Sequence, residues 1–98
     1  MCLIVAAVEA SDRYRLMLCA NRDERHARPS AAARWWPENP NIIGGRDLVA
    51  GGSWLALTRT GRLAAVTNYR TPEGSVGLRS RGDLVAGYVV GDRSLDAY

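Results

Sequence analysis

The first two dozen residues constrain the fold most strongly, because two short apolar runs end there in a dense set of polar side chains. Residues 2–8 form a continuous apolar run, and residues 14–20 form a second, mostly apolar run that includes Arg15, after a turn-forming stretch. Such short runs are typical of strands, and the first is expected to be buried. We expect an antiparallel hairpin, which would place the polar tetrad Asn21-Arg22-Asp23-Glu24 beside Cys2.

The middle of the chain predicts little regular structure before a second hairpin. Residues 21–52 are interrupted by prolines and glycines, so we expect a long loop anchored by Trp35-Trp36, with at most a helical turn or two at residues 30–34. Residues 54–58 and residues 62–67 predict two strands joined by a tight turn.

The last part of the chain predicts a turn and then a helix. Pro72, Gly74 and Gly77 are breakers, and Ser80 has the character of an N-cap. Gly91 is expected to end the helix. The apolar residues at helical spacing on one face are Leu84, Val85, Tyr88 and Val89.

Chain length and charge limit the kinds of function that this protein can have. A chain of 98 residues suffices for one small domain, and its 47% apolar and 23% charged content is ordinary for a globular protein. All 13 basic residues are arginines, which favours anionic partners and indicates a GC-rich, bacterial coding sequence. These arginines are spread along the chain, whereas nucleic-acid binding requires a clustered basic face. We therefore expect no nucleic-acid partner.

The cysteines and the single histidine predict neither a disulfide framework nor a metal site. Cys19 lies inside an apolar run and is expected to pack as a small hydrophobe. His26 has no second ligand at metal-binding spacing, so no metal or cofactor is expected. Residues 2–8 are too short to span a bilayer and lack the features of a secretory signal. The cytoplasm is the expected location.

Five motifs, in this order along the chain, resemble the NRDE family, also called the transport and Golgi organisation protein 2 family. They are Met1-Cys2, the polar tetrad, Gly51-Gly52-Ser53-Trp54-Leu55, Leu63-Ala64-Ala65-Val66-Thr67-Asn68-Tyr69 and Ser80-Arg81-Gly82-Asp83-Leu84. The resemblance covers essentially the whole chain. Because members of that family are much longer, it implies that residues 1–98 are the N-terminal portion of a single NRDE-family domain.

The NRDE family in turn looks like the N-terminal nucleophile hydrolases. This implies an α+β fold: part of an αββα sandwich with two antiparallel hairpins, a long loop and a C-terminal helix. In such enzymes a cysteine at the processed N-terminus attacks an amide, and Cys2 matches that nucleophile. Arg22 matches an arginine that contacts it, Asp23 is a looser match to an aspartate, and Asn68 matches an asparagine of the oxyanion hole.

The resemblance leaves two functions open. One is a hydrolase or acyltransferase that acts on C–N bonds of a small-molecule substrate; its base would be the α-amine of Cys2, with a pKa of about 8, once Met1 is removed. The other is non-catalytic binding or trafficking of a hydrophobic metabolite such as a lipid, an acyl-CoA or haem. A purely structural role for Cys2 and an Arg22–Asp23 ion pair is the third interpretation. Half a sandwich would expose one sheet face, which predicts association into a homo-oligomer.

Overall fold

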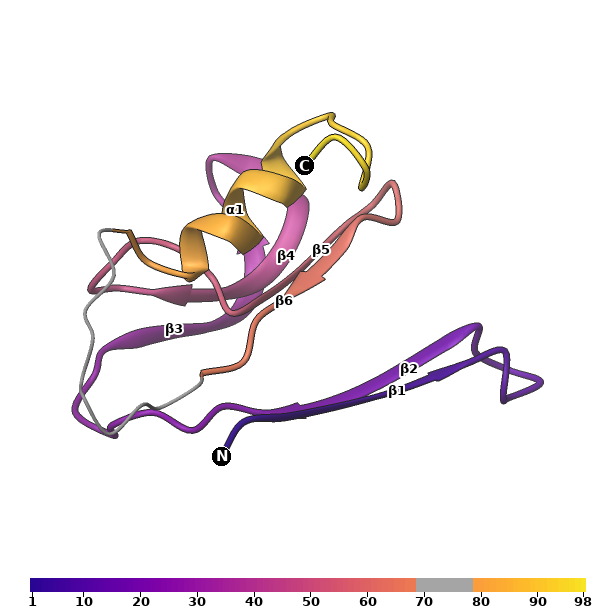
Figure 1. Ribbon diagram of the computed structural model, residues 1–98, viewed down its shortest axis with the longest axis horizontal. Helices are drawn as coiled ribbons and strands as arrows, with labels where there is room; N and C mark the ends of the chain where they lie inside the picture. The colour runs from indigo at the N-terminus through magenta and orange to yellow at the C-terminus, as the bar shows by residue number, and fades with distance from the viewer. Residues whose placement is uncertain (69–78) are drawn as a thin grey trace.

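The computed structural model describes residues 1–68 and 79–98 and contains two antiparallel sheets and one helix (Figure 1). In the smaller sheet, β1 (Leu3–Val8) pairs with β2 (Leu16–Asn21). The larger sheet has the order β3-β4-β5-β6, with bounds Ser30–Trp36, Asn39–Asp47, Leu55–Thr58 and Leu63–Ala65. The helix is α1 (Gly82–Val90). Tyr69 and the predicted breakers Pro72, Gly74 and Gly77 lie outside the described residues.

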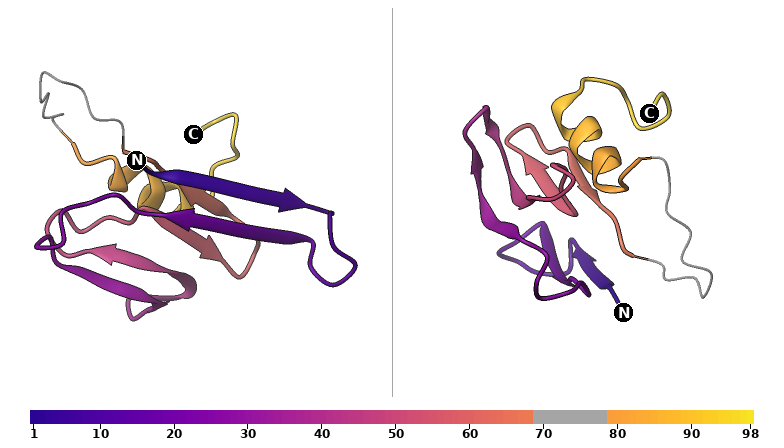
Figure 2. Two further views of the ribbon diagram at one scale, coloured as in Figure 1. Left: turned by 90° about the horizontal axis from the view of Figure 1, so that it is seen from below. Right: turned by 90° about the vertical axis from the view of Figure 1, so that its left-hand side faces the viewer.

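The elements lie in layers. The helix α1 covers one side of the four-stranded sheet, and the β1–β2 hairpin lies on the other side and extends away from it (Figures 1 and 2). This arrangement confirms the α+β class and is consistent with part of a sandwich. Both predicted hairpins are also confirmed, since Leu3 pairs with Asn21 in the first and Leu55 pairs with Ala65 in the second.

The interpretation of residues 21–52 as irregular is wrong over about half of its length. Residues 30–36 and 39–47 form β3 and β4, joined by a turn at Pro37 and Glu38. Pro40 lies within an irregularity of the β3–β4 pairing, between the pairs Trp35–Ile43 and Trp36–Asn39, and such irregularities are where strands tolerate proline. Sheet pairing along β4 therefore overrides local signals that are typical of a loop.

One of the two tryptophans builds the core. Trp36 is 2% exposed and donates its Nε1–H to the carbonyl of Gly44 at 3.1 Å. It packs in a cluster of buried side chains from the sheet and the helix: Ile42, Ala56, Val85, Tyr88 and Val89. Its neighbour Trp35 points to the other face of the sheet and is 43% exposed. Trp36 is thus a core residue of a sheet, and not the anchor of a loop.

The predicted helix is confirmed, with one change to its buried face. The N-cap position is Arg81 and not Ser80 as expected, and no side chain caps it. The hydroxyl of Ser80 still accepts the N–H of Gly82 at 3.2 Å, and Gly91 stands at the C-terminal cap. The residues that face the sheet are Val85, Tyr88 and Val89. Leu84 was expected on the same face and is 57% exposed, because the 85/88/89 stripe faces the sheet and Leu84 lies about 100° away from Val85 around the helix axis.

The β1–β2 hairpin is apolar but exposed, which contradicts two expectations. Ile4 and Leu18 are partly buried, but the other large apolar side chains of the two strands are 42–68% exposed: Leu3, Val5, Val8, Leu16 and Met17. Cys19 is exposed as well and does not pack as a buried hydrophobe. Within residues 1–68 and 79–98, β1 and β2 pack extensively only on each other. An apolar run predicts a strand, whereas burial also needs a second layer on each face.

Candidate functional site

Cys2 lies immediately before β1, beside the residues that follow β2. Leu3 pairs with Asn21, the first residue of the tetrad, at the end of the hairpin. The next tetrad residues therefore lie beside the Cys2 thiol. The backbone N–H of Asp23 donates to the Sγ of Cys2 at 3.2 Å, and this Sγ lies 4.0 Å from the carbonyl oxygen of Asp23. The predicted juxtaposition of the tetrad with Cys2 is therefore present, and Cys2 is half-buried by it.

Asn68 joins this group from the other sheet. It follows β6, and its side-chain Nδ2 donates to the carbonyl oxygen of Asp23 at 3.5 Å. The backbone N–H of Asn68, and next that of Asp23, lower the pKa of the Cys2 thiol, whereas burial and the Asp23 carboxylate raise it. Hydrogen-bond donors that face a sulfur favour its thiolate form. We call Cys2, Asp23 and Asn68 the Cys2 cluster.

The carboxylate of Asp23 binds the N-terminal ammonium. It forms an ion pair with the N-terminal ammonium of Met1, and its side chain is 40% exposed. One residue thus contributes a backbone donor to the thiol and a carboxylate to the neighbouring ammonium.

Arg22 stacks on an aromatic ring. Its guanidinium lies 4.3 Å from the centre of the Trp54 ring. Gly45 lies close to the same ring, since a Cβ at that position would come within 2.3 Å of a ring carbon. The two largest effects that lower the pKa of Cys2 come from backbone N–H groups and not from a guanidinium. In this structure Arg22 joins the hairpin to the four-stranded sheet through a cation–π contact.

Asn21 has a function in the structure that the sequence did not reveal. Its Nδ2 donates to the carbonyl of Met1 at 2.8 Å, and its Oδ1 accepts the N–H of Leu3 at 2.9 Å. One side chain therefore holds the backbone on both sides of Cys2. Asn21 was visible in the tetrad, but this role follows only from the register of β1 and β2.

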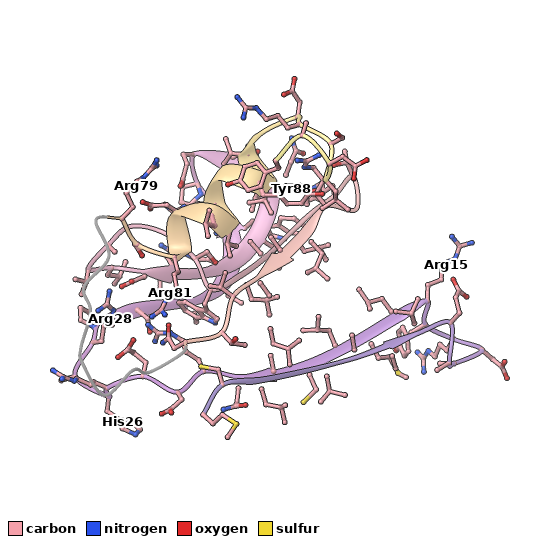
Figure 3. All side chains as sticks on the ribbon, viewed as in Figure 1. Arg15, His26, Arg28, Arg79, Arg81 and Tyr88 are labelled. Atoms are coloured by element: carbon pink, nitrogen blue, oxygen red, sulfur yellow. The ribbon has the colours of Figure 1, made fainter. Side chains whose placement is uncertain are left out.

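The connection between the two sheets is tethered by an ion pair. Arg28 donates from Nε and from one terminal nitrogen to the carboxylate of Asp47, at 3.1 and 2.7 Å. These bonds lower the pKa of Asp47. His26 projects outward from the same connection (Figure 3). Among residues 1–68 and 79–98, no group of three histidine, cysteine or acidic side chains is arranged to hold a metal.

The one helix that the structure describes is not long and apolar enough to cross a membrane.

Comparison with known proteins gives consistent matches along the chain. A sequence model described as Transport and Golgi organisation 2 matches residues 1–98. The Transport and Golgi organization protein 2 homolog of Bos taurus is 38% identical over 105 residues, which cover 100% of this chain and 38% of the relative. The human homolog is 39% identical over 99 residues, covering 94% of this chain and 36% of the relative. Transport and Golgi organization protein 2 of Drosophila melanogaster is 35% identical over 101 residues, covering 91% of this chain and 35% of the relative.

The chain thus spans between 35% and 38% of the length of these curated relatives. All three relatives come from animals, and the bacterial origin indicated by the arginine content stays a prediction.

Proposed function

Because this chain belongs to the Transport and Golgi organisation 2 family, we propose that it contributes Cys2 as the nucleophile of a hydrolase or acyltransferase that acts on C–N bonds. The observation that carries this proposal is the meeting of Cys2, Asp23 and Asn68, in which the Asp23 N–H donates to the thiol at 3.2 Å and the Asn68 side chain donates to the Asp23 carbonyl at 3.5 Å. We also propose that residues 1–98 are the N-terminal portion of a single domain. The greater length of the relatives supports this division.

The proposed reaction begins after Met1 is removed. The free α-amine of Cys2 takes the thiol proton, and the thiolate attacks the carbonyl carbon of the substrate amide. The tetrahedral intermediate collapses as the C–N bond breaks, and the α-ammonium returns its proton to the leaving nitrogen. Water, or an acceptor amine in the case of an acyltransferase, then attacks the acyl-thioester and restores the thiol.

Two members of the Cys2 cluster have proposed roles in these steps. The Asp23 carboxylate, which pairs with the ammonium of Met1 here, orients the ammonium of Cys2 in the processed chain. The Asn68 side chain donates to the oxyanion of the intermediate, and such a donor contributes about 3 kcal/mol. Arg22 supports the site through its contact with Trp54 and is available to an anionic substrate group.

A second candidate function is non-catalytic binding of a hydrophobic metabolite such as a lipid, an acyl-CoA or haem. It is favoured by a row of paired apolar residues on the sheet face opposite α1. Trp35 pairs with Ile43, Ile43 with Leu57 and Leu57 with Leu63, so the row crosses all four strands. Its members include Trp35 and Leu57, both more than a third exposed. In this function Arg22 would bind the anionic end of the ligand.

Acylation of Cys2 tests the catalytic proposal. The full-length protein is first weighed by intact mass spectrometry to establish loss of Met1, and is then incubated with an amide or thioester probe. A stable acyl adduct on wild type and on Cys19→Ala, but not on Cys2→Ala, is the expected result. Retention of Met1, or an adduct that persists in Cys2→Ala, would reject Cys2 as the nucleophile. Ligand binding that survives Cys2→Ala and fails in Arg22→Ala would support the second function instead.

Two further properties are proposed with this function. The exposed apolar side chains of the hairpin support association of the 98-residue chain into a homo-oligomer. A single monomeric species by light scattering, with a cooperative melt, would contradict that. A cytoplasmic location stays a prediction from the sequence.

A further inference from the structure

We propose that Asn21 is a positioning residue that fixes the backbone around Cys2 and thereby directs the thiol toward the N–H group of Asp23. The proposal rests on the proposed function for its chemical purpose, since it concerns the same thiol. It assigns Asn21 no contact with substrate.

The geometry of the end of the hairpin supports this role. Asn21 is the last residue of β2, and its Cα is the register partner of Leu3. Beyond this pair the regular ladder ends, and the Asn21 carboxamide takes over by bonding the carbonyl of Met1 and the N–H of Leu3, the groups on either side of residue 2. A carboxamide suits this task because it carries a donor and an acceptor on one short side chain.

Fixing these two neighbours restricts the direction of the Cys2 side chain. Successive residues of a strand point to opposite faces, so holding Leu3 also selects the face that Cys2 occupies. On that face the Asp23 N–H reaches Sγ at 3.2 Å. Without the bridge the first two residues gain rotational freedom, and the thiol loses fixed donors that lower its pKa.

The two bonds of Asn21 differ in their dependence on Met1. The bond from the Leu3 N–H to Oδ1 involves no atom of Met1, so it persists after Met1 is removed. The bond from Nδ2 requires the Met1 carbonyl and ends with its removal. In the processed protein the acceptor oxygen therefore carries the positioning effect, and Asn21→Asp retains that oxygen whereas Asn21→Ala removes it.

The test measures the pH dependence of alkylation of Cys2 by iodoacetamide in the full-length protein. Peptide mass spectrometry follows Cys2, with Cys19 on the same hairpin as an internal reference. We expect Asn21→Ala to move the Cys2 profile to higher pH and to slow its alkylation at pH 7 by about two- to tenfold, the range set by loss of one ordinary hydrogen bond. Asn21→Asp keeps the acceptor oxygen but adds a carboxylate that by itself raises the pKa of a neighbouring thiol. Its expected rescue is therefore wild-type protection of the Leu3 N–H from hydrogen exchange, which Asn21→Ala should lose. The exposed β4 residue in Asn41→Ala provides the control and should leave the profile unchanged.

An unchanged Cys2 profile in Asn21→Ala would overturn the proposal, as would equal shifts in Asn21→Ala and Asn41→Ala. If Asn21→Ala fails to fold, the decisive measurement is hydrogen exchange at the Leu3 N–H in Asn21→Asp. Protection close to wild type supports the acceptor role, and faster exchange at Leu3 in a folded protein rejects it. Alkylation requires no acyl transfer, so this test is independent of the reaction. A shifted profile without any acyl adduct would reject the proposed function alone, and an acyl adduct with an unshifted profile would reject only the role of Asn21.

Discussion

The β1–β2 hairpin and the four-stranded sheet have similarly apolar strands but are held in place by different means. The sheet buries Trp36, Ile42 and Ala56 against α1. The hairpin leaves Leu3, Val5 and Val8 exposed, and the described contacts that join it to the sheet involve Arg22 with Trp54 and Asn68 with Asp23. Hydrophobic packing thus stabilises one region, whereas directional contacts at a single end hold the other.

The end of the hairpin that meets the sheet also holds the candidate reactive groups. The end at which the hairpin meets the sheet is also the place where the thiol, the N-terminal ammonium and the Asp23 carboxylate come together. Residues that orient the hairpin therefore also orient the proposed nucleophile. Substitutions in the sheet should affect global stability, and substitutions at this end should affect Cys2.

The largest effect is expected in the core of the sheet. Trp36→Ala removes a 2% exposed side chain and its hydrogen bond to Gly44, so it should lower the free energy of unfolding by about 3–5 kcal/mol. Trp35→Ala, at an exposed position of the same strand, provides the matched control and should cost far less. Denaturant titration followed by circular dichroism measures both. Equal losses would contradict the assignment of the core to the α1 side of the sheet.

The next effect concerns the connection between the two regions. Arg28→Ala removes both Arg28 hydrogen bonds from the Asp47 carboxylate, a buried group that keeps only its backbone donors such as Val49, and should cost about 1–3 kcal/mol at pH 7. Because the folded-state pKa of Asp47 is lowered, this stabilisation is fully present above the unfolded pKa of about 3.9 and is lost as the pH falls through the lower folded pKa.

Denaturant titrations of wild type and Arg28→Ala across this pH range test the sign of the effect. The difference between the two proteins should shrink in acid. A difference that grows as the pH falls would contradict the account of this ion pair.

A smaller and more local effect is expected where the hairpin meets the sheet. Arg22→Ala removes the cation–π contact with Trp54, worth about 0.5–2 kcal/mol, and should increase hydrogen exchange at residues 21–24 while the sheet stays protected. Arg59→Ala removes an arginine stacked at 3.8 Å on Trp35 within the sheet, so it is the matched control. If both variants release residues 21–24 equally, Arg22 has no special role in holding the hairpin.

The smallest effect is expected on the exposed strand itself. Val5→Thr keeps a β-branched side chain at an exposed position and should change stability by less than about 0.5 kcal/mol. The same substitution at buried Val85 places a hydroxyl in the core and should cost about 1–3 kcal/mol. Thermal melts compare the two variants. A comparable loss at Val5 would show that the hairpin is buried in solution, for example by self-association.

Local patterns predicted the two hairpins, the helix and the meeting of Cys2 with Asp23, because antiparallel register alone brings these residues together. They did not predict β3 and β4, whose prolines are accommodated in a turn and in an irregularity of the strand pairing. They also missed the exposure of Leu84 and Cys19, which depends on what covers each face. The bridge made by Asn21 required knowledge of both strand ends at once.

The central claim is that the contacts at the end of the hairpin activate Cys2, and competition between the two thiols of one molecule tests it most directly. The full-length wild-type protein is treated at pH 7 with limiting iodoacetamide, and the modified peptides are quantified. Exposure alone favours Cys19, because Cys2 is half-buried. The account predicts that Cys2 is modified first, because backbone donors from Asn68 and Asp23 lower its pKa. Preferential modification of Cys19, or equal modification of both thiols, would contradict it.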